Sequence, residues 1–275
     1  MFRPYQTSDP LPAHLAEAFA AVRARLAPIG RRVLFFNKTA STNDIALTLA
    51  ADADAEGTVV IADEQTSGRG RLGRVWHSPP GSGLYVSIVL RRSSAPASAD
   101  RATGLLTLAA GVALAEAVEE VTSLRPDIKW PNDLMIGRRK LAGILAESAS
   151  SDLLHIVLGY GINVGAGRLP SDVDARATSL ESELGRPADR AVLCAVTVAA
   201  ISQRYRDLSD GRFDAILDAW RARSPSSRGA RVTWMTPAGA ESGVTEGIDD
   251  RGALLVRAGA RLERIVGGEV IWSPL

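Results

Sequence analysis

Cysteine is almost absent from this 275-residue chain, which contains one cysteine and three histidines. One thiol cannot form an intrachain disulfide, and Cys194 has no cysteine or histidine neighbour at the spacing of metal ligands. A disulfide scaffold and a zinc site are therefore excluded. This usage is typical of a reducing compartment, so we expect a cytoplasmic protein. Cys194 lies among apolar residues and is expected to be core.

Net charge and long hydrophobic runs are also missing. The chain has 32 Lys and Arg residues against 31 Asp and Glu residues, a formal net charge of +1, so it has no overall field that would hold a nucleic acid. The most apolar window, residues 105–118, is shorter than the ~20 residues that cross a bilayer. The N-terminal segment has no apolar secretory stretch. We therefore expect neither nucleic acid nor a membrane as a partner.

Lysine is scarce as well, because only Lys38, Lys129 and Lys140 are lysines among the 32 basic residues. A genome biased towards arginine explains the imbalance. A lysine kept against such a bias is a candidate functional residue, because a compact ammonium is not interchangeable with a planar guanidinium where one acceptor must be reached. Lys129 and Lys140 lie in the region richest in motifs, whereas Lys38 is expected to be an exposed surface residue.

Hydrophobic periodicity predicts helices and strands in succession up to residue 223. Helical spacing predicts helices at 11–26, 42–51, 101–121, 188–208 and 212–223, and Ser41 is placed to cap the second of them. Alternating or short apolar runs predict strands at 33–36, 58–62, 84–90, 128–130, 134–136, 141–147 and 153–158. We expect strand 84–90 to bury one face and to pair beside 58–62. The last four strands should form a meander.

A second unit begins after residues 224–229, a stretch of Ser, Pro and Gly that is typical of a linker. Beyond it, short alternating segments at 232–235, 243–248, 253–257 and 269–272 predict a small β-barrel. The expected organisation is an N-terminal helical extension (1–30), an α+β domain built on a mixed sheet with helices (31–225), and a C-terminal barrel (229–275).

The long loop 64–83 contains the spacing G-x-G-x-x-G at Gly68, Gly70 and Gly73. A dinucleotide-binding fold would need a helix opening at these glycines and an acidic residue about 20 positions later. Residues 75–81 disfavour a helix and the first acidic residue after the loop is Asp100, so that fold is rejected. Three arginines on a glycine-flexible backbone remain, which fits either an anion-binding loop or a solvated basic turn.

A second cluster of polar residues lies at 129–145. Lys129-Trp130-Pro131-Asn132-Asp133 ends a predicted strand, and a hairpin would bring Lys140 near Asn132 and Asp133. Gly143 in the middle of a strand suggests close approach of a ligand or of another backbone. A salt-bridged hairpin would explain the same pattern. The three histidines have no recognisable partners, and neither a nucleophile elbow nor a P-loop is present, so the residues alone indicate an anion-handling α/β enzyme.

These motifs together resemble those of the biotin protein ligases, also called biotin-[acetyl-CoA-carboxylase] ligases. The similarity covers Ser41-Thr42-Asn43, residues 64–74, Trp76, residues 129–133, residues 140–145, residues 161–163 and Gly267-Gly268-Glu269. It implies a class II synthetase-like mixed sheet with an SH3-like C-terminal barrel. It also implies a two-step reaction, in which biotin and ATP form biotinyl-5′-adenylate and a lysine of a biotin carboxyl carrier domain then accepts the biotin and releases AMP.

The resemblance assigns roles to individual residues, all of which precede the linker. The implied biotin-binding residues are Ser41, Thr42, Asn43, Gln65, Gly68, Arg69, Gly70, Arg71, Lys140, Gly143 and Gly161. The implied ATP- and adenylate-binding residues are Arg69, Arg71, Arg74, Trp76, Asn132, Lys140 and Asn163. Lys140, Arg71 and Asp133 are the implied catalytic residues. Mg²⁺ is expected to arrive with ATP, with no resident metal site, and the resemblance also allows a homodimer.

Two other functions are compatible with parts of this pattern. A lipoate-protein ligase is thought to share the architecture, although the Gly-Arg-Gly-Arg loop and the Lys-Trp-Pro-Asn-Asp block favour biotin. A catalytically silent, ligand-responsive adaptor is disfavoured because Lys140 and the loop arginines are retained. Some family members add a winged helix-turn-helix and repress transcription. Only 40 residues precede Ser41 here, with one clear helix, so we expect no repressor activity.

Overall fold

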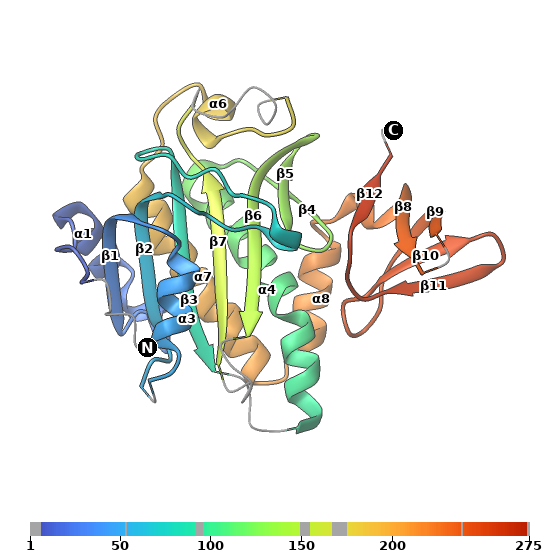
Figure 1. The fold of residues 1–275 in the computed structure, drawn as a ribbon, viewed down its shortest axis with the longest axis horizontal. Helices are drawn as coiled ribbons and strands as arrows, with labels where there is room; N and C mark the ends of the chain where they lie inside the picture. The colour runs from blue at the N-terminus through green and yellow to red at the C-terminus, as the bar shows by residue number, and fades with distance from the viewer. Residues whose placement is uncertain are drawn as a thin grey trace.

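A mixed seven-stranded sheet forms the larger part of the computed structural model, which describes residues 7–52, 54–91, 96–148, 155–166, 175–237 and 239–273 (Figure 1). The strand order is β1-β2-β3-β7-β6-β5-β4. The strands are β1 Arg32–Thr39, β2 Thr58–Gln65, β3 Gly83–Arg91, β4 Asp127–Lys129, β5 Asp133–Ile136, β6 Arg139–Ser148 and β7 His155–Asn163. Among the strands of the described residues, β1 and β2 pair in parallel and the other neighbours in this sheet pair antiparallel. The predicted mixed sheet, the pairing of 58–62 with 84–90 and the meander are confirmed.

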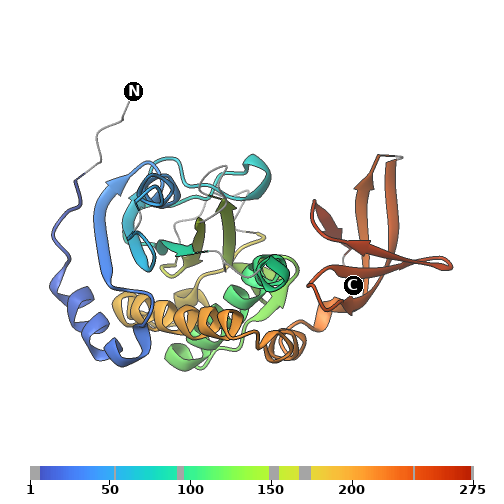
Figure 2. The ribbon, with the colours of Figure 1, turned by 90° about the horizontal axis from the view of Figure 1, so that it is seen from below.

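Helices cover both faces of this sheet. They are α1 Ala13–Ala21, α2 Arg23–Leu26, α3 Thr42–Leu49, α4 Pro96–Thr122, α6 Leu180–Leu184, α7 Arg190–Ser209 and α8 Phe213–Arg221. Figure 2 shows α3 on one side of the sheet and the long α7 on the other. Two separate hydrophobic cores result, the smaller of them beneath α3 around Phe36, Val60 and Val89.

The second core explains a wrong prediction. Strand β3 was expected to bury one face only, yet every residue from Gly83 to Leu90 is buried and only Arg91 is exposed. Because α3 packs on the face that would otherwise meet water, both sets of alternating side chains lie in apolar surroundings. The serine within this run, Ser87, is fully buried.

Helix α4 is the longest of the described helices, and its apolar part is longer than the predicted window 105–118. Residues Asp100–Thr122 are long and apolar enough to cross a membrane by length and composition. In the structure 67% of the most apolar window is buried inside the protein, where Leu105, Val112 and Leu114 belong to the main core. Core packing therefore accounts for the apolar character of α4.

Several element boundaries differ from expectation. The helix predicted at 11–26 is divided at Val22 into α1 and α2, and Ser41 stands at the N-cap of α3 without a capping hydrogen bond from its side chain. Of the strand predicted at 153–158, residues 153 and 154 lie outside the described residues, and β7 begins at His155. Cys194 is fully buried as expected, and burial raises the pKa of its thiol to about 12.

A second sheet lies beyond α8 and the short 3-10 helix η2 Pro225–Ser227 (Figures 1 and 2). It is antiparallel, with strand order β11-β10-β9-β8-β12. Its strands are β8 Arg228–Thr236, β9 Gly239–Ile248, β10 Leu254–Ala258, β11 Arg261–Ile265 and β12 Val270–Trp272. Strand β11 was missed because Arg261, Glu263 and Arg264 mask its short alternation.

The two sheets meet at a close contact. Gly252 precedes β10 with φ +82°, and a Cβ there would lie 2.7 Å from Leu108 Cδ1 of α4. Its carbonyl accepts a hydrogen bond of 3.0 Å from Trp130 Nε1. Glycine is therefore needed both for the backbone conformation and for the contact with α4.

Candidate functional site

A cavity of about 780 Å³ lies between the loop that follows β2 and strands β5, β6 and β7. Its volume is in the range of ligand pockets. Most of the residues that the sequence singled out line it: Ser41, Asn43, Gln65, Arg69, Gly70, Arg71, Arg74, Trp76, Asn132, Asp133, Lys140, Gly143, Gly161 and Asn163. Thr42 and Gly68 do not line it and instead hold residues that do.

The glycine-rich loop folds back on itself over the cavity. Gly70 donates a backbone hydrogen bond to Arg74 (2.7 Å), and Trp76 donates one to Gly68 (2.9 Å). A Cβ at Gly68 would lie 2.4 Å from the carbonyl oxygen of Trp76, so only glycine fits there. At the tip, Leu72 has a left-handed backbone (φ 57°) and an exposed side chain. The glycine spacing thus builds a tight reversal that carries three arginines.

A neutral, largely buried cluster adjoins the cavity, and two of its members, Asn43 and Gln65, line it. Gln65 Oε1 accepts from the backbone N–H of Thr42 (2.8 Å), and Gln65 Nε2 donates to Ser78 (2.9 Å). Ser87 Oγ lies 2.8 Å from Thr42 Oγ1 and 2.5 Å from Asn43 Oδ1. We call Thr42, Asn43, Gln65 and Ser87 the polar cluster. Its members are fixed by one another before any ligand arrives.

Two residues that build this cluster, Ser87 and Gly159, were given no role from the sequence. Ser87 lies on the face of β3 that was predicted to meet water, so a serine there gave no signal of a buried role. Gly159 of β7 makes room for the cluster, because a Cβ there would lie 2.0 Å from Asn43 Oδ1. A glycine in the middle of a buried strand was the available signal for that contact.

Each loop arginine is held by groups outside the loop. Arg69 pairs with Asp44 of α3 (2.8 Å) and with Glu147 of β6 (3.0 Å). Arg74 forms an ion pair with Glu269.

The third loop arginine, Arg71, reaches deeper. Its Nη1 donates to Asn132 Oδ1 (3.2 Å) and its Nη2 to the carbonyl of Gly268 (3.5 Å). Burial lowers the pKa of Arg71, and nearby Arg74 lowers it further while Asp133 raises it. A guanidinium that has lost part of its hydration in this way is suited to bind an anion, to which it donates hydrogen bonds.

The two lysines of the motif region face the same cavity. Lys140 Nζ lies 2.6 Å from Asp133 Oδ1, as the predicted hairpin required, and 5.4 Å from the centre of the Trp76 ring. Lys129 Nζ lies 5.7 Å from the centre of the Trp272 ring, and burial lowers the pKa of Lys129. The cavity therefore brings the ammonium of Lys140 next to the carboxylate of Asp133 and places Lys129 on the same wall.

Trp76 explains two glycines of the sheet. A Cβ at Gly161 would lie 2.3 Å from its indole nitrogen, and one at Gly143 would lie 3.1 Å from its ring. The close approach expected at Gly143 is thus made by an aromatic side chain in this structure. The indole nitrogen of Trp76 is buried and has no hydrogen-bond partner among the described residues.

The two asparagines mainly hold backbone segments in place. Asn132 Nδ2 donates to the carbonyl of Ile144 (2.8 Å), and Asn163 Nδ2 donates to that of Thr178 (3.0 Å). Thr178 in turn donates its backbone N–H to Lys140 (2.9 Å). Asn163 thereby supports the strand that presents Lys140, while Asn132 also receives Arg71.

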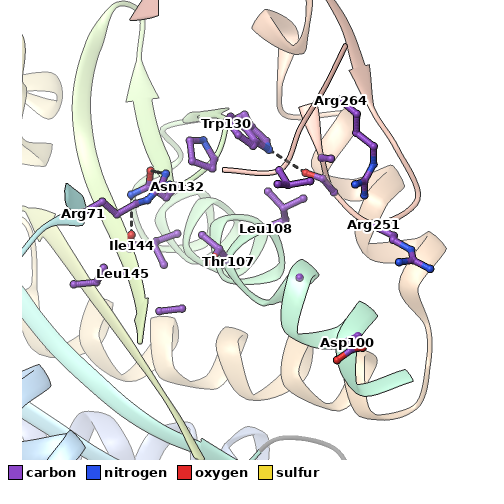
Figure 3. Close-up of a pocket in the computed structure, with 16 residues that line it drawn as sticks. Arg71, Asp100, Thr107, Leu108, Trp130, Asn132, Ile144, Leu145, Arg251 and Arg264 are labelled. Carbon is purple, nitrogen blue, oxygen red and sulfur yellow. Dashed lines mark hydrogen bonds between the residues drawn. The ribbon is translucent and has the colours of Figure 1, made fainter. Parts of the chain in front are cut away.

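The C-terminal sheet contributes to the cavity, contrary to the expectation that all ligand-facing residues precede the linker. Gly268, Glu269, Val270 and Trp272 line it. The Gly267-Gly268-Glu269 motif was the available signal. A second cavity of about 340 Å³ lies in the seam between α4 and this sheet, with Trp130 and Asn132 on one wall and Arg251 and Arg264 on the other (Figure 3). Arg71 and Asn132 belong to both cavities.

Comparison with known proteins gives consistent results. Residues 35–163 match the biotin/lipoate A/B protein ligase family, and residues 229–272 match the biotin protein ligase C terminal domain. The bifunctional ligase/repressor BirA of Bacillus subtilis is 33% identical over 263 residues, which cover 94% of this chain and 79% of that protein. The biotin-[acetyl-CoA-carboxylase] ligase of Mycobacterium tuberculosis is 36% identical over 240 residues, covering 85% and 86% of the two chains.

Among solved structures, the biotin protein ligase from Aquifex aeolicus in complex with biotin and ATP superposes with a TM-score of 0.75 at 28% identity. The superposition covers 89% of this chain and 99% of that one.

Proposed function

Because this chain belongs to the biotin protein ligase family, we propose that it activates biotin with ATP and transfers it to a lysine of a biotin carboxyl carrier domain. In the first step a carboxylate oxygen of biotin attacks the α-phosphorus of ATP, the bond to the β-phosphate breaks, and pyrophosphate leaves. In the second step the neutral amine of the acceptor lysine attacks the acyl carbon of biotinyl-5′-adenylate, an amide forms, and AMP leaves.

One observation carries this proposal: Arg69, Arg71 and Lys140 line one cavity together with Asn43 and Gln65 of the polar cluster. Bringing a carboxylate against a polyphosphate requires cations that offset the repulsion between like charges. The polar cluster offers neutral hydrogen-bonding groups suited to the ureido ring of biotin. We assign Lys140 to the carboxylate and α-phosphate oxygens, and Arg69 and Arg71 to the carboxylate and the phosphates.

The glycine-rich loop suits the protection of the adenylate. Its arginines are held by Asp44, Glu147 and Glu269, partners that an anionic ligand can replace. When the loop closes on a ligand it excludes water, which would otherwise hydrolyse the mixed anhydride. Trp76, stacked over Gly143 and Gly161, supplies an aromatic surface beside the proposed nucleotide site.

Mg²⁺ is proposed to enter with ATP. Asp133 is suited to act as a single carboxylate ligand, because its Oδ1 is buried, has no hydrogen-bond partner among the described residues and lies 2.6 Å from the ammonium of Lys140. Magnesium in nucleotide sites is commonly held by one or two carboxylates and the substrate phosphates. When bound, it would offset phosphate charge, while Lys140 and the arginines orient the reacting oxygens.

The remaining features of the proposal concern organisation and partners. The proposed acceptor is the carrier domain of acetyl-CoA carboxylase or a related carboxylase, as the names of the relatives suggest. We propose a division into residues 1–30, 31–225 and 229–275 and a cytoplasmic location. We also propose that the protein does not bind DNA, because α1 and α2 pack against α7. A homodimer stays a prediction.

The test is pyrophosphate exchange with biotin and, separately, with lipoate, followed by transfer to a purified carrier domain. We expect exchange with biotin and biotin-dependent labelling of one carrier lysine. Exchange with lipoate but not with biotin would show that lipoate, not biotin, is the substrate. Biotin binding without any exchange would indicate the adaptor function instead.

A further inference from the structure

Glu147 connects two segments of the site that are far apart in the sequence. Its Oε2 accepts a hydrogen bond from Asn43 Nδ2 (2.6 Å) and another from Arg69 Nη2 (3.0 Å). Asn43 belongs to the polar cluster at the start of α3, and Arg69 belongs to the glycine-rich loop. One carboxylate oxygen therefore holds one donor from each segment.

The contacts on either side of Glu147 form a continuous chain. Asn43 Oδ1 accepts from the fully buried Ser87 (2.5 Å), so the amide of Asn43 has a fixed orientation. At the other end, Arg69 also pairs with Asp44 (2.8 Å). The side chain of Glu147 is 28% exposed and that of Arg69 is 37% exposed. The pair is partly shielded from water but remains open to exchange of partners.

We propose that Glu147 is a positioning residue that couples biotin binding at Asn43 to the position of Arg69 in the loop; this inference rests on the proposed function. An anion that enters beneath the loop competes with Glu147 and Asp44 for the guanidinium of Arg69. Once Arg69 binds the ligand, Glu147 Oε2 accepts a hydrogen bond from Asn43 Nδ2 alone, and it holds the amide of Asn43 more firmly. Loop closure and recognition at the polar cluster thus reinforce each other.

Glu147→Gln tests this coupling, because it keeps the shape of the side chain and removes its charge. We expect the KM for biotin in pyrophosphate exchange to rise about tenfold, the lower end for a hydrogen bond to a charged group. We expect kcat and the KM for ATP to change by smaller factors than the KM for biotin, because Asn43 is a proposed biotin contact alone, whereas Arg69 is shared between biotin and ATP. A merely structural role would lower the melting temperature and leave this ratio of effects unmoved.

A double-mutant cycle with Arg69→Gln gives the second readout. If the two residues act through each other, the KM for biotin of the double variant should exceed the wild-type KM by no more than the larger of the two single-variant factors. That factor should lie about threefold or more below the product of the two single-variant factors. Glu246→Gln is the matched control, because Glu246 pairs with Arg257 at 2.5 Å in the C-terminal sheet, away from the cavity. It should leave the KM for biotin unchanged.

The outcomes separate the two proposals. A wild-type protein without biotin-dependent exchange contradicts the proposed function and, with it, the coupling. An active wild-type protein whose folded Glu147→Gln variant keeps the wild-type KM for biotin, or whose cycle with Arg69→Gln is additive, contradicts the coupling alone. If Glu147→Gln does not fold, Glu147→Asp, which withdraws the carboxylate by one methylene, should raise the KM in the same direction.

Discussion

The polar cluster and the glycine-rich loop handle their polar groups in opposite ways. In the polar cluster, Thr42, Asn43 and Ser87 are buried and hydrogen-bonded to one another at 2.5 to 2.8 Å. In the loop, the side chains of Arg69 and Arg74 are more than one-third exposed and that of Arg71 is half-buried. Their partners are carboxylates and carbonyls from other segments.

This difference separates recognition from closure. Moving a member of the polar cluster would leave buried polar groups unsatisfied, which costs about 1 to 3 kcal/mol each. Exchanging the partner of a surface arginine costs little, because exposed ion pairs contribute about 0 to 1 kcal/mol. The polar cluster is therefore suited to read a neutral ring in one geometry, while the loop is suited to move and to trade its present anions for those of a ligand.

The largest effect should come from adding a methyl group behind the polar cluster. In Gly159→Ala the new Cβ would lie 2.0 Å from Asn43 Oδ1, so the amide must shift and lose its contacts with Ser87 and Glu147. Overpacking costs about 1 to 3 kcal/mol, which at the upper end is a loss of biotin affinity of about 100-fold. Calorimetry measures this loss. Gly104→Ala on α4 is the control, because its Cβ would make only ordinary contact at 3.4 Å. Equal affinities in the two variants would show that the polar cluster is not rigid.

Lys140→Arg should reduce the rate of adenylate formation by roughly ten- to a hundred-fold, although it keeps the charge. The ammonium of Lys140 is confined between Asp133 at 2.6 Å and the Trp76 ring at 5.4 Å, where the wider guanidinium does not fit in the same way. Pyrophosphate exchange measures the rate. Lys38→Arg, on an exposed lysine paired with Glu64 at 2.8 Å, is the matched control. Wild-type exchange in Lys140→Arg would remove this role from Lys140.

Arg71→Ala should speed the release of biotinyl-adenylate about tenfold while changing the affinity for free biotin less. Arg71 lies on the loop side and contacts Asn132 and Gly268, whereas the polar cluster stays intact in this variant. The expected sign is AMP production without biotinylated carrier, because leaked adenylate hydrolyses in solution. If both affinities fell by the same factor and no free adenylate appeared, the loop would act as a plain biotin clamp.

The same contrast separates what the sequence predicted from what it did not. The loop arginines, Lys140 and Asp133 were visible because charged residues among glycines stand out locally, and the predicted hairpin placed Lys140 near Asp133 correctly. The roles of Ser87 and Gly159 were not predicted, because they depend on the register of β3 and β7 and on α3 above them. Local periodicity predicts elements, but it does not encode the register in which buried strands pair.

The contribution of the C-terminal sheet was missed for a related reason. Gly268 and Glu269 belong to a sheet whose Gly252 packs against Leu108 and accepts the hydrogen bond from Trp130, and these contacts span more than a hundred residues. No local pattern around residue 269 reveals that it will face Arg74. The family motif at 267–269 was visible, but its spatial partner was not.

The smallest effect should come from Glu269→Gln, which removes the partner of Arg74. The side chains of Arg74 and Glu269 are 68% and 46% exposed, so solvent screens the pair strongly and its loss should be worth about 0 to 1 kcal/mol. We expect the KM for biotin and the melting temperature to stay near wild-type values, and the adenylate release rate to change by less than about twofold. Any difference between variant and wild type should disappear as ionic strength rises, because the Debye length falls to about 3 Å at 1 M salt. Release rates measured at low and high salt check this. A change of tenfold or more, unaffected by salt, would mean that the C-terminal sheet latches the loop, and the division between a rigid polar cluster and an easily released loop would fail.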